Sequence, residues 1–347
     1  MTRKERFLAA CRGERVDHPP VWLMRQAGRY MAEYRAVRAR HSLLDICHRP
    51  ELAAEVTITA AERLGTDAAI VFADLLLPTA PLGLNLEFTA GEGPRITPPL
   101  RTAAQIAALP DDWQGSLEFV SEAITQVDRH FGGEMPVLGF AGAPFTLASY
   151  LIEGGPSTHY LATRQLMRQE PAAWNTLLGK LVNGLAEFCA EQAAAGAAAI
   201  QLFDSWAGTL APEEYRHSVL PHVQRLVALV RASGVPVIYF STGTTGYLEL
   251  TAACGADVLS LDWRVDMAAA WERLQALPHP PLAVQGNLDP TLLLASPTVR
   301  EAATTRLLES MKGKPGYIFN LGHGILPATS VEAVEALVRQ VQASAAC

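Results

Sequence analysis

Residues 171–206 read PAAWNTLLGKLVNGLAEFCAEQAAAGAAAIQLFDSW and combine two kinds of pattern. Apolar side chains recur every three or four residues over Pro171–Ala195, and the segment opens with proline, which predicts a helix. Ala198–Phe203 is a short apolar run that predicts a buried strand, and the polar residues Asp204 and Ser205 follow it directly. The stretch therefore predicts one helix–strand unit whose strand ends in polar side chains.

The same alternation of short apolar runs and longer helical patterns extends along the whole chain. Further helical patterns cover Pro50–Leu64, Pro212–Ala232 and Val331–Ala343. Alternating strands and helices are typical of βαβ units. We therefore expect an α/β fold, a single-domain (β/α)8 TIM-type barrel over residues 1–347, including a short basic N-terminal segment and a flexible C-terminal tail. The predicted strands are Pro20–Met24, Ala68–Phe72, Pro136–Phe140, Ala198–Phe203, Pro236–Phe240, Asp257–Leu261, Leu282–Gln285 and Tyr317–Leu321.

A doubly wound sheet is the alternative α/β architecture. It usually has fewer strands, and its nucleotide-binding form carries a GxGxxG turn after the first strand, which this chain lacks. Between the second and third predicted strands, residues 84–99 read LNLEFTAGEGPRITPP, with alternating side chains and a glycine turn. This pattern predicts a hairpin that departs from the barrel.

Composition narrows the class of protein. Hydrophobic residues make up 49% of the chain and charged residues 18%, which excludes disorder for most of it. No apolar run approaches the ~18 residues of a membrane helix, and residues 1–15 lack the apolar segment of a secretory signal. The 5 cysteines are scattered singly, without a CxxC, so we expect neither a disulfide framework nor a zinc cluster. We expect a cytoplasmic protein without a membrane partner.

The charges are unevenly distributed. The net charge is −7, which argues against nucleic acid as a partner. Residues 1–49 nevertheless carry 11 basic and 5 acidic side chains, a net charge of +6 that leaves −13 for the rest. An acidic chain thus concentrates arginine in its first segment.

Active sites of such barrels lie at the carboxyl ends of the strands, so the residues that follow each predicted strand are candidates. Arg25 and Arg29 follow the first strand with Gly28 between them, and two guanidiniums suit carboxylate or phosphate groups. Asp74 follows the second strand, where an ionised carboxylate needs a partner. By this reasoning alone, a loop aspartate bonded to its neighbours is as good an interpretation. His323 follows the last strand between two glycines.

Two further polar residues, Tyr150 and Ser205, are better interpreted from the residues alone as structural. Tyr150 lies on the helix that Pro144 begins, and Ser205 has no partner histidine for nucleophilic work. The chain has no HExxH motif and no Walker loop, and none of its lysines ends a predicted strand. These absences disfavour metalloprotease, nucleotide and Schiff-base chemistry.

Seven segments together resemble one family, the uroporphyrinogen decarboxylases, and the resemblance runs from about Arg6 to Val341. The segments at residues 25–29 and 142–150, RQAGR and GAPFTLASY, are the most specific. One departure is YFSTGTTG at Tyr239–Gly246, where the family would lead us to expect a lysine. The segments are PPVWLMRQAGRYMAEYR, FADLLLP, GFAGAPFTLASYLIEGG, LFDSWAG, GADVLSLDW, VQGNLDP and YIFNLGHGILP.

The resemblance implies a homodimeric (β/α)8 barrel that needs no cofactor or metal. Its expected activity in heme (porphyrin) biosynthesis is the removal of CO2 from the four acetate groups of uroporphyrinogen III, giving coproporphyrinogen III. The catalytic residues that it implies are Asp74, Arg25, Tyr150 and His323, with Asp74 as the essential carboxylate. The implied substrate-binding residues are Arg25, Gln26, Ala27, Gly28, Arg29, Asp74, Tyr150, Ser205 and His323.

The proton donor is left open by the sequence, among Arg25, His323 and Tyr150 with water. Two other functions also fit parts of the pattern. Zinc-dependent methyl transfer on the same fold would need His and Cys ligands, but the chain has Ser241, Thr242 and His323 at the corresponding strand ends and no cysteine nearby. A non-catalytic tetrapyrrole- or polyanion-binding protein would need the arginines but not Asp74.

Overall fold

The computed structural model describes residues 1–89 and 93–344. In the stretch 171–206, helix α9 covers Pro171–Ala194 with proline in its first turn, and strand β5 covers Ala199–Asp204. Proline fits there because its missing N–H has no partner in the first turn of a helix. The helix–strand unit predicted from this stretch is confirmed.

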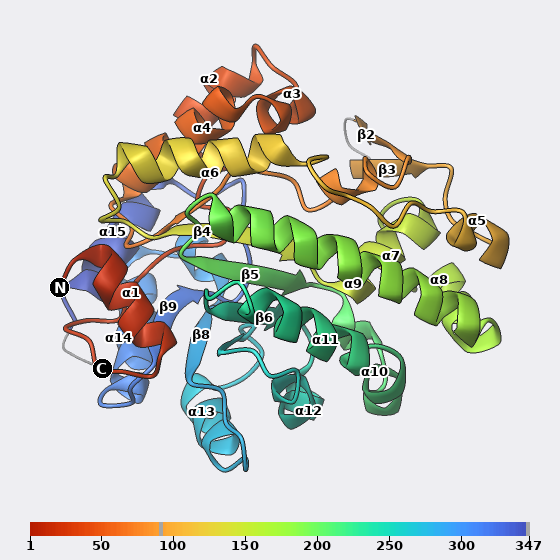
Figure 1. Cartoon of the computed structure of the whole chain (residues 1–347). Helices are drawn as coiled ribbons and strands as arrows, with labels where there is room; N and C mark the ends of the chain where they lie inside the picture. The colour runs from red at the N-terminus through yellow and green to blue at the C-terminus, as the bar shows by residue number, and fades with distance from the viewer. Residues whose placement is uncertain (90–92, 345–347) are drawn as a thin grey trace.

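Seven parallel strands form one curled sheet in the order β1-β4-β5-β6-β7-β8-β9. Helices surround this sheet, which lies at the centre of the molecule (Figure 1). The predicted α/β barrel class is confirmed, and seven of the eight predicted strands form within a few residues of their expected bounds. The strands are β1 (Ala69–Ile70), β2 (Asn85–Thr89), β3 (Gly93–Thr97), β4 (Val137–Gly142), β5 (Ala199–Asp204), β6 (Val237–Ser241), β7 (Val258–Ser260), β8 (Ala283–Leu288) and β9 (Tyr317–Leu321).

The first predicted strand, Pro20–Met24, is wrong as a regular strand, because it forms only an isolated bridge from Val21 to Phe319. It nevertheless fills the place between β9 and β1. Phe319 N donates to Pro20 O at 2.9 Å, and Asp67 N donates to Val21 O at 2.7 Å. Pro20 has no N–H, and the Val21 N–H donates to the Asp67 carboxylate rather than to a carbonyl. Side-chain acceptors thus replace part of the ladder where the barrel closes.

The helices mostly match the sequence pattern, since α4 has the predicted bounds and α15 ends one residue early. The single helix predicted at Pro212–Ala232 is wrong. It is broken at Val219, because Pro221 cannot donate to the preceding turn. The α-helices are α1 (Arg3–Cys11), α2 (Ala32–Arg38), α3 (Leu43–His48), α4 (Pro50–Leu64), α5 (Ala103–Ala107), α6 (Glu118–His130), α7 (Pro144–Glu153), α8 (Leu161–Gln169), α9 (Pro171–Ala194), α10 (Pro212–Ser218), α11 (Leu220–Arg231), α12 (Leu248–Ala252), α13 (Met267–Gln275), α14 (Pro297–Met311) and α15 (Val331–Gln342). The 3-10 turns are η1 (Leu77–Thr79), η2 (Ala207–Thr209), η3 (Thr245–Tyr247) and η4 (Pro290–Leu294).

The predicted excursion between the second and third barrel strands is confirmed as an antiparallel hairpin of β2 and β3, at the upper right of Figure 1. Its predicted glycine turn falls on residues 90–92, outside the described residues. The end of the predicted C-terminal tail, residues 345–347, also lies outside them.

The barrel interior is filled by side chains rather than open. Trp22 Nε1 donates to Gln285 Oε1 at 2.9 Å, and Gln285 Nε2 donates to Gln201 Oε1 at 3.0 Å and to Ser260 Oγ at 2.9 Å. All four residues are fully buried. Because buried polar groups are costly when unpaired, this network allows glutamines to occupy the centre of the barrel. Reactive groups are therefore confined to the ends of the strands.

Candidate active site

The segment Arg25–Arg29 turns sharply at the carboxyl end of the barrel. Arg25 has a φ of 61°, a left-handed conformation that is uncommon for any residue other than glycine. The Arg35 guanidinium donates to the carbonyls of Arg29 and Tyr30 at 3.0 and 2.8 Å. An unusual backbone held by neighbouring contacts at a strand end is typical of a functional site.

The two glycines around His323 each make room for one neighbour. A Cβ on Gly322 would lie 2.3 Å from Trp263 N, and a Cβ on Gly324 would lie 2.4 Å from Arg25 Cδ. Glycine is therefore needed at Gly322, where backbone atoms are in the way, whereas a larger residue at Gly324 would displace the Arg25 side chain. The Gly-His-Gly sequence places His323 between the loop after β7 and the Arg25 side chain.

His323 is held as a neutral hydrogen-bond donor. Gly324 N donates to His323 Nδ1 at 2.8 Å, so in the neutral ring the proton is on Nε2. Burial and the positive charges of Arg25 and Arg264 lower the pKa of His323 to about 4, against a smaller opposing effect of Asp262. At neutral pH the ring is therefore uncharged.

Asp74 follows β1 at the end of a buried segment and is itself only partly buried. One of its carboxylate oxygens accepts from Leu76 N at 2.8 Å. Burial raises the pKa of Asp74 above its ordinary value, while that hydrogen bond and the Arg25 charge oppose the rise. The carboxylate thus keeps acceptor capacity for a further partner.

Tyr150 lies on α7 and stacks on a tryptophan after β5. The centroids of the Tyr150 and Trp206 rings are 3.9 Å apart, and Tyr160 packs on the same tryptophan at 4.7 Å. Burial, together with the Asp74 charge, raises the pKa of Tyr150 to about 12, so the phenol stays protonated at neutral pH. The charge of Arg25 acts on the pKa of Asp74, of Tyr150 and of His323, so these predicted catalytic residues are within electrostatic range of one arginine.

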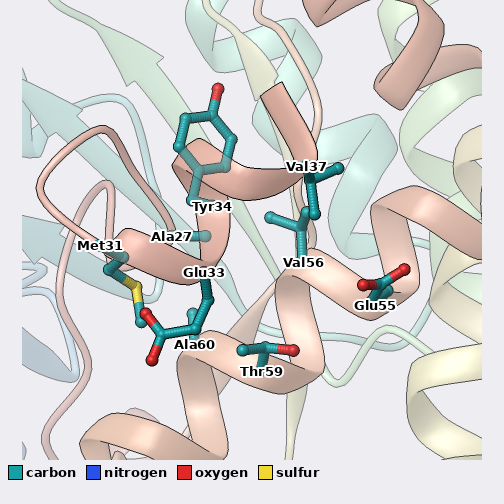
Figure 2. Close-up of a pocket in the computed structure, with 9 residues that line it drawn as sticks. All are labelled: Ala27, Met31, Glu33, Tyr34, Val37, Glu55, Val56, Thr59 and Ala60. Carbon is teal, nitrogen blue, oxygen red and sulfur yellow. The ribbon is translucent and has the colours of Figure 1, made fainter. Parts of the chain in front are cut away.

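The other predicted site residues are placed differently. The buried Gln26 side chain donates to Ala68 O at 3.1 Å and accepts from Leu23 N at 3.2 Å, so it holds the loop rather than facing solvent. Ala27 lines a cavity of about 30 Å³ between the 27–37 segment and α4 (Figure 2). Ser205 is partly buried, and its carbonyl accepts from Thr242 Oγ1 at 2.5 Å. Arg29 is exposed.

Two acidic residues at strand ends have roles that the sequence reasoning did not assign. Asp204, at the end of β5, is fully buried and accepts from Thr146 Oγ1 and Tyr239 OH, both at 2.7 Å. Burial raises its pKa to about 6, and the two donors limit the rise. Because Thr146 lies one helical turn before Tyr150 on α7, Asp204 fixes the helix that carries Tyr150.

Asp262, just after β7, accepts three hydrogen bonds. Gly243 N donates to Oδ2 at 2.6 Å, Arg264 Nη1 donates to Oδ2 at 2.7 Å, and Arg264 N donates to Oδ1 at 2.9 Å. Asp262 thus ties the β6 loop, where the family would lead us to expect a lysine, to the β7 loop. The sequence signal was a charged pair, Asp262 and Arg264, directly after a buried strand.

Two cavities of the structure have none of Arg25, Asp74, Tyr150 and His323 in their linings. The one in Figure 2 has room for about one water molecule. Another, of about 500 Å³, lies at the amino end of the barrel and is lined by residues that include Arg6, His18 and Asp67. Among residues 1–89 and 93–344, no group of three or more His, Cys, Asp or Glu side chains is arranged to hold a metal ion.

Comparison with known proteins identifies the family. Residues 2–344 match the sequence model of the family described as "Uroporphyrinogen decarboxylase (URO-D)". The chain belongs to this family. It is 52% identical over 336 residues to the uroporphyrinogen decarboxylase of Koribacter versatilis, covering 96% of this chain and 95% of the relative. It is 48% identical over 337 residues to that of Solibacter usitatus, covering 97% and 96%.

A solved structure supports the fold across the whole chain. A methyltransferase from Methanosarcina mazei superposes with a TM-score of 0.83 at 22% identity, covering 99% of this chain and 98% of that one. At this identity the likeness concerns the fold alone. Within the part of the chain that the structure describes, no helix is long and apolar enough to span a membrane.

Proposed function

We propose that this chain removes CO2 from the four acetate side chains of uroporphyrinogen III to give coproporphyrinogen III, without a cofactor. The observation that carries the proposal is Asp74, a partly buried carboxylate within electrostatic range of Arg25 at the carboxyl end of a barrel of the uroporphyrinogen decarboxylase family. Curated relatives with this name match nearly the full length of the chain. A cytoplasmic homodimer is part of the proposal.

The reaction requires a sink for electrons. A pyrrole acetate cannot release CO2 directly, because the electron pair of the broken C–C bond has no acceptor. Protonation of the adjacent ring carbon turns the pyrrole into an iminium cation. The carboxylate then leaves as CO2, the electron pair forms a C=C bond to the ring and neutralises the cation, and the exocyclic carbon takes a proton as the ring carbon loses one. The enzyme must supply a proton and stabilise a cation.

Asp74 suits the stabilising role. Its carboxylate would accept hydrogen bonds from the inward pyrrole N–H groups and oppose the positive charge that develops on the ring. Two opposite charges ~4 Å apart gain about 4 kcal/mol at an effective dielectric of ~20, a useful part of the ~8–23 kcal/mol that enzymes provide. Because the carboxylate is in place before the charge appears, it acts mainly on the transition state.

The remaining residues divide between binding and proton supply. Arg25 and Arg29 would bind carboxylates of the substrate. Ala27, Gly28 and Ser205 complete the proposed binding set together with Gln26, whose buried side chain shapes the loop, so that its own contact would be through the backbone. His323, uncharged at neutral pH, would donate a hydrogen bond from Nε2 rather than act as an acid. Arg25 and Tyr150, which both interact electrostatically with Asp74, then remain as candidate proton donors.

The direct test is anaerobic incubation of the purified protein with uroporphyrinogen III. Oxidation to porphyrins and chromatography should give the series from seven to four carboxylates. Absence of product would overturn the proposed reaction. Binding of uroporphyrinogen without turnover would support the polyanion-binding alternative. Solvent isotope effects on Arg25→Lys and Tyr150→Phe would then separate the two donors, since only loss of the donor should change the isotope effect on kcat.

A further inference from the structure

Arg264 is an exposed arginine that is held unusually firmly. Its side chain is 50% exposed, yet Nη1 donates to the buried Asp262 carboxylate at 2.7 Å. The guanidinium lies over the Trp263 ring, 4.0 Å from its centroid. Asn287 Nδ2 fixes the same loop by donating to Asp262 O and Val265 O, both at 2.8 Å. A surface arginine usually gains little from one ion pair, so this degree of ordering calls for an explanation.

The loop that carries Arg264 packs against His323. Trp263 N fills the space that a side chain on Gly322 would take, and the rings of Trp263 and His323 meet edge to face at 6.2 Å. Arg264 is therefore part of the candidate active site, four residues after the end of β7 at Ser260.

Arg25 and Arg264 approach His323 from two different loops, since Arg25 packs against Gly324, whereas Trp263, on which Arg264 stacks, packs against Gly322. The charge of Arg25 acts on Asp74, Tyr150 and His323, whereas that of Arg264 acts on His323 alone among these. Arg264 thus reaches the site on the Gly322 side of His323, and it is not among the charges that act on Asp74. If Asp74 binds the centre of the macrocycle, Arg264 lies at its periphery.

The N–H groups that Asp262 leaves free on the Arg264 guanidinium are suited to bind a carboxylate. Within the described residues, Asp262 is the acceptor found for its guanidinium and uses one edge of it. The remaining N–H groups are preorganised by the stacking on Trp263, and a planar guanidinium with free donors binds carboxylates in two-point geometry.

We propose that Arg264 binds a peripheral propionate carboxylate of the substrate, on the Gly322 side of His323. This inference rests on the proposed function. Propionate is favoured over acetate because it extends further from the ring and is retained through all four decarboxylations. Arg264 would thus serve every step of the reaction in the same way.

The test is steady-state kinetics of Arg264→Gln with uroporphyrinogen and with its heptacarboxylate and pentacarboxylate intermediates. We expect KM to rise about tenfold for all three substrates, since one charge-assisted contact is lost, while kcat changes less than about twofold. Arg273→Gln is the matched control. Arg273 lies on α13, is 39% exposed and pairs with Glu249 at 2.8 Å. Its KM should equal that of the wild type.

The outcomes separate the inference from the function on which it rests. An inactive wild-type protein overturns the proposed function, whereas an active wild type with an unchanged KM in Arg264→Gln overturns only the role of Arg264. A KM effect that shrinks as acetates are removed overturns the assignment to propionate. If Arg264→Gln is too unstable for kinetics, the KM of Arg264→Lys is measured instead. A lysine can keep the ion pair with Asp262 but cannot bind a carboxylate at two points. A KM several times higher supports the proposal, and an unchanged KM overturns it.

A second readout does not depend on activity. In NMR titrations of labelled imidazoles, Arg264→Gln should raise the pKa of His323, since one of the two cations that lower it is removed. Arg273→Gln should leave it unchanged. An unchanged His323 pKa in Arg264→Gln would contradict the placement of Arg264 in the site.

Discussion

The two ends of the barrel both contain arginine, aspartate and histidine, but they use them in opposite ways. At the amino end, Arg6 donates from Nε and Nη2 to Asp17 at 2.6 and 2.8 Å and from Nη1 to Asp67 at 3.2 Å. Asp67 also accepts from Val21 N at 2.9 Å, and His18 lies 3.7 Å from both carboxylates. Paired with Arg6, Asp17 has a pKa well below its usual range. This end ties α1 to the segment that closes the barrel.

At the carboxyl end the same residue types keep hydrogen-bond donors and acceptors that no other residue in the described part of the chain uses. The Asp74 carboxylate accepts one hydrogen bond from Leu76 N, and the described residues provide no acceptor for the Arg25 guanidinium. The pKa of Asp74 is raised rather than lowered. Residue type alone therefore does not distinguish a structural cluster from a catalytic one. The difference lies in how many hydrogen-bond donors and acceptors the fold leaves unpaired. Mutations at the carboxyl end should therefore lower activity, and mutations at the amino end should lower stability.

The largest effect is expected at Asp74. Asp74→Asn should lower kcat/KM about a thousandfold, because the ~4 kcal/mol of charge stabilisation is lost. It should not lower Tm, since burial already disfavours the ionised carboxylate. Product analysis and thermal unfolding measure the two effects. Asp74→Glu tests placement, and near-normal turnover of Asp74→Asn would refute the role of the charge.

The reverse result is expected at the amino end. Arg6→Met leaves the buried Asp67 without its cation and should cost about 3–5 kcal/mol of unfolding free energy. The folded fraction should keep the kcat of the wild type. Denaturant unfolding and kinetics at low temperature would show this, and a proportional loss of kcat would contradict the division between the two ends.

A pH-dependent effect on stability comes from the buried support of the site. Asp204 has a pKa raised to about 6 from a usual 3.8, so between these values the folded state binds a proton that the unfolded state does not. This contribution to the unfolding free energy is present at low pH and is lost as pH rises, by about 3 kcal/mol. Unfolding of wild type and Asp204→Asn from pH 4 to 7 measures it as the difference in slope. Parallel pH curves would rule out this titration.

These contrasts also show what the sequence could and could not predict. Arg25, Asp74 and His323 became candidates because each follows an apolar run, and a barrel brings all such positions to one end. The catalytic role of Asp74 was predicted from the resemblance to the family. The hydrogen bonds of Asp204 join residues 58 and 35 positions apart, and no spacing pattern reports such pairs. Gln26 shows another limit, since its place in the motif does not reveal that its side-chain amide donates to Ala68 O and so holds the loop.

The errors in the fold have the same origin. Pro20–Met24 has the composition of a strand, but the Asp67 side chain, 46 residues from Val21, replaces a backbone acceptor there. The break at Val219 could have been predicted from Pro221, since proline inside a helical pattern ends or kinks the helix. Apolar periodicity thus determines the elements, while individual tertiary hydrogen bonds determine where they become irregular.

The smallest effect is expected from His323. Because its pKa is lowered to about 4, the ring is already neutral at the ~6.5 where an ordinary histidine titrates. His323→Gln should therefore reduce kcat/KM by about tenfold or less, by altering one hydrogen bond, and leave the shape of the pH–rate profile unchanged. The acid limb belongs instead to Asp74 and should lie above the pH of an ordinary aspartate. If the pH–rate profile instead has an acid limb at ~6.5 that disappears in His323→Gln, then His323 acts as an acid. In that case the charges of Arg25 and Arg264 do not lower its pKa as the structure indicates.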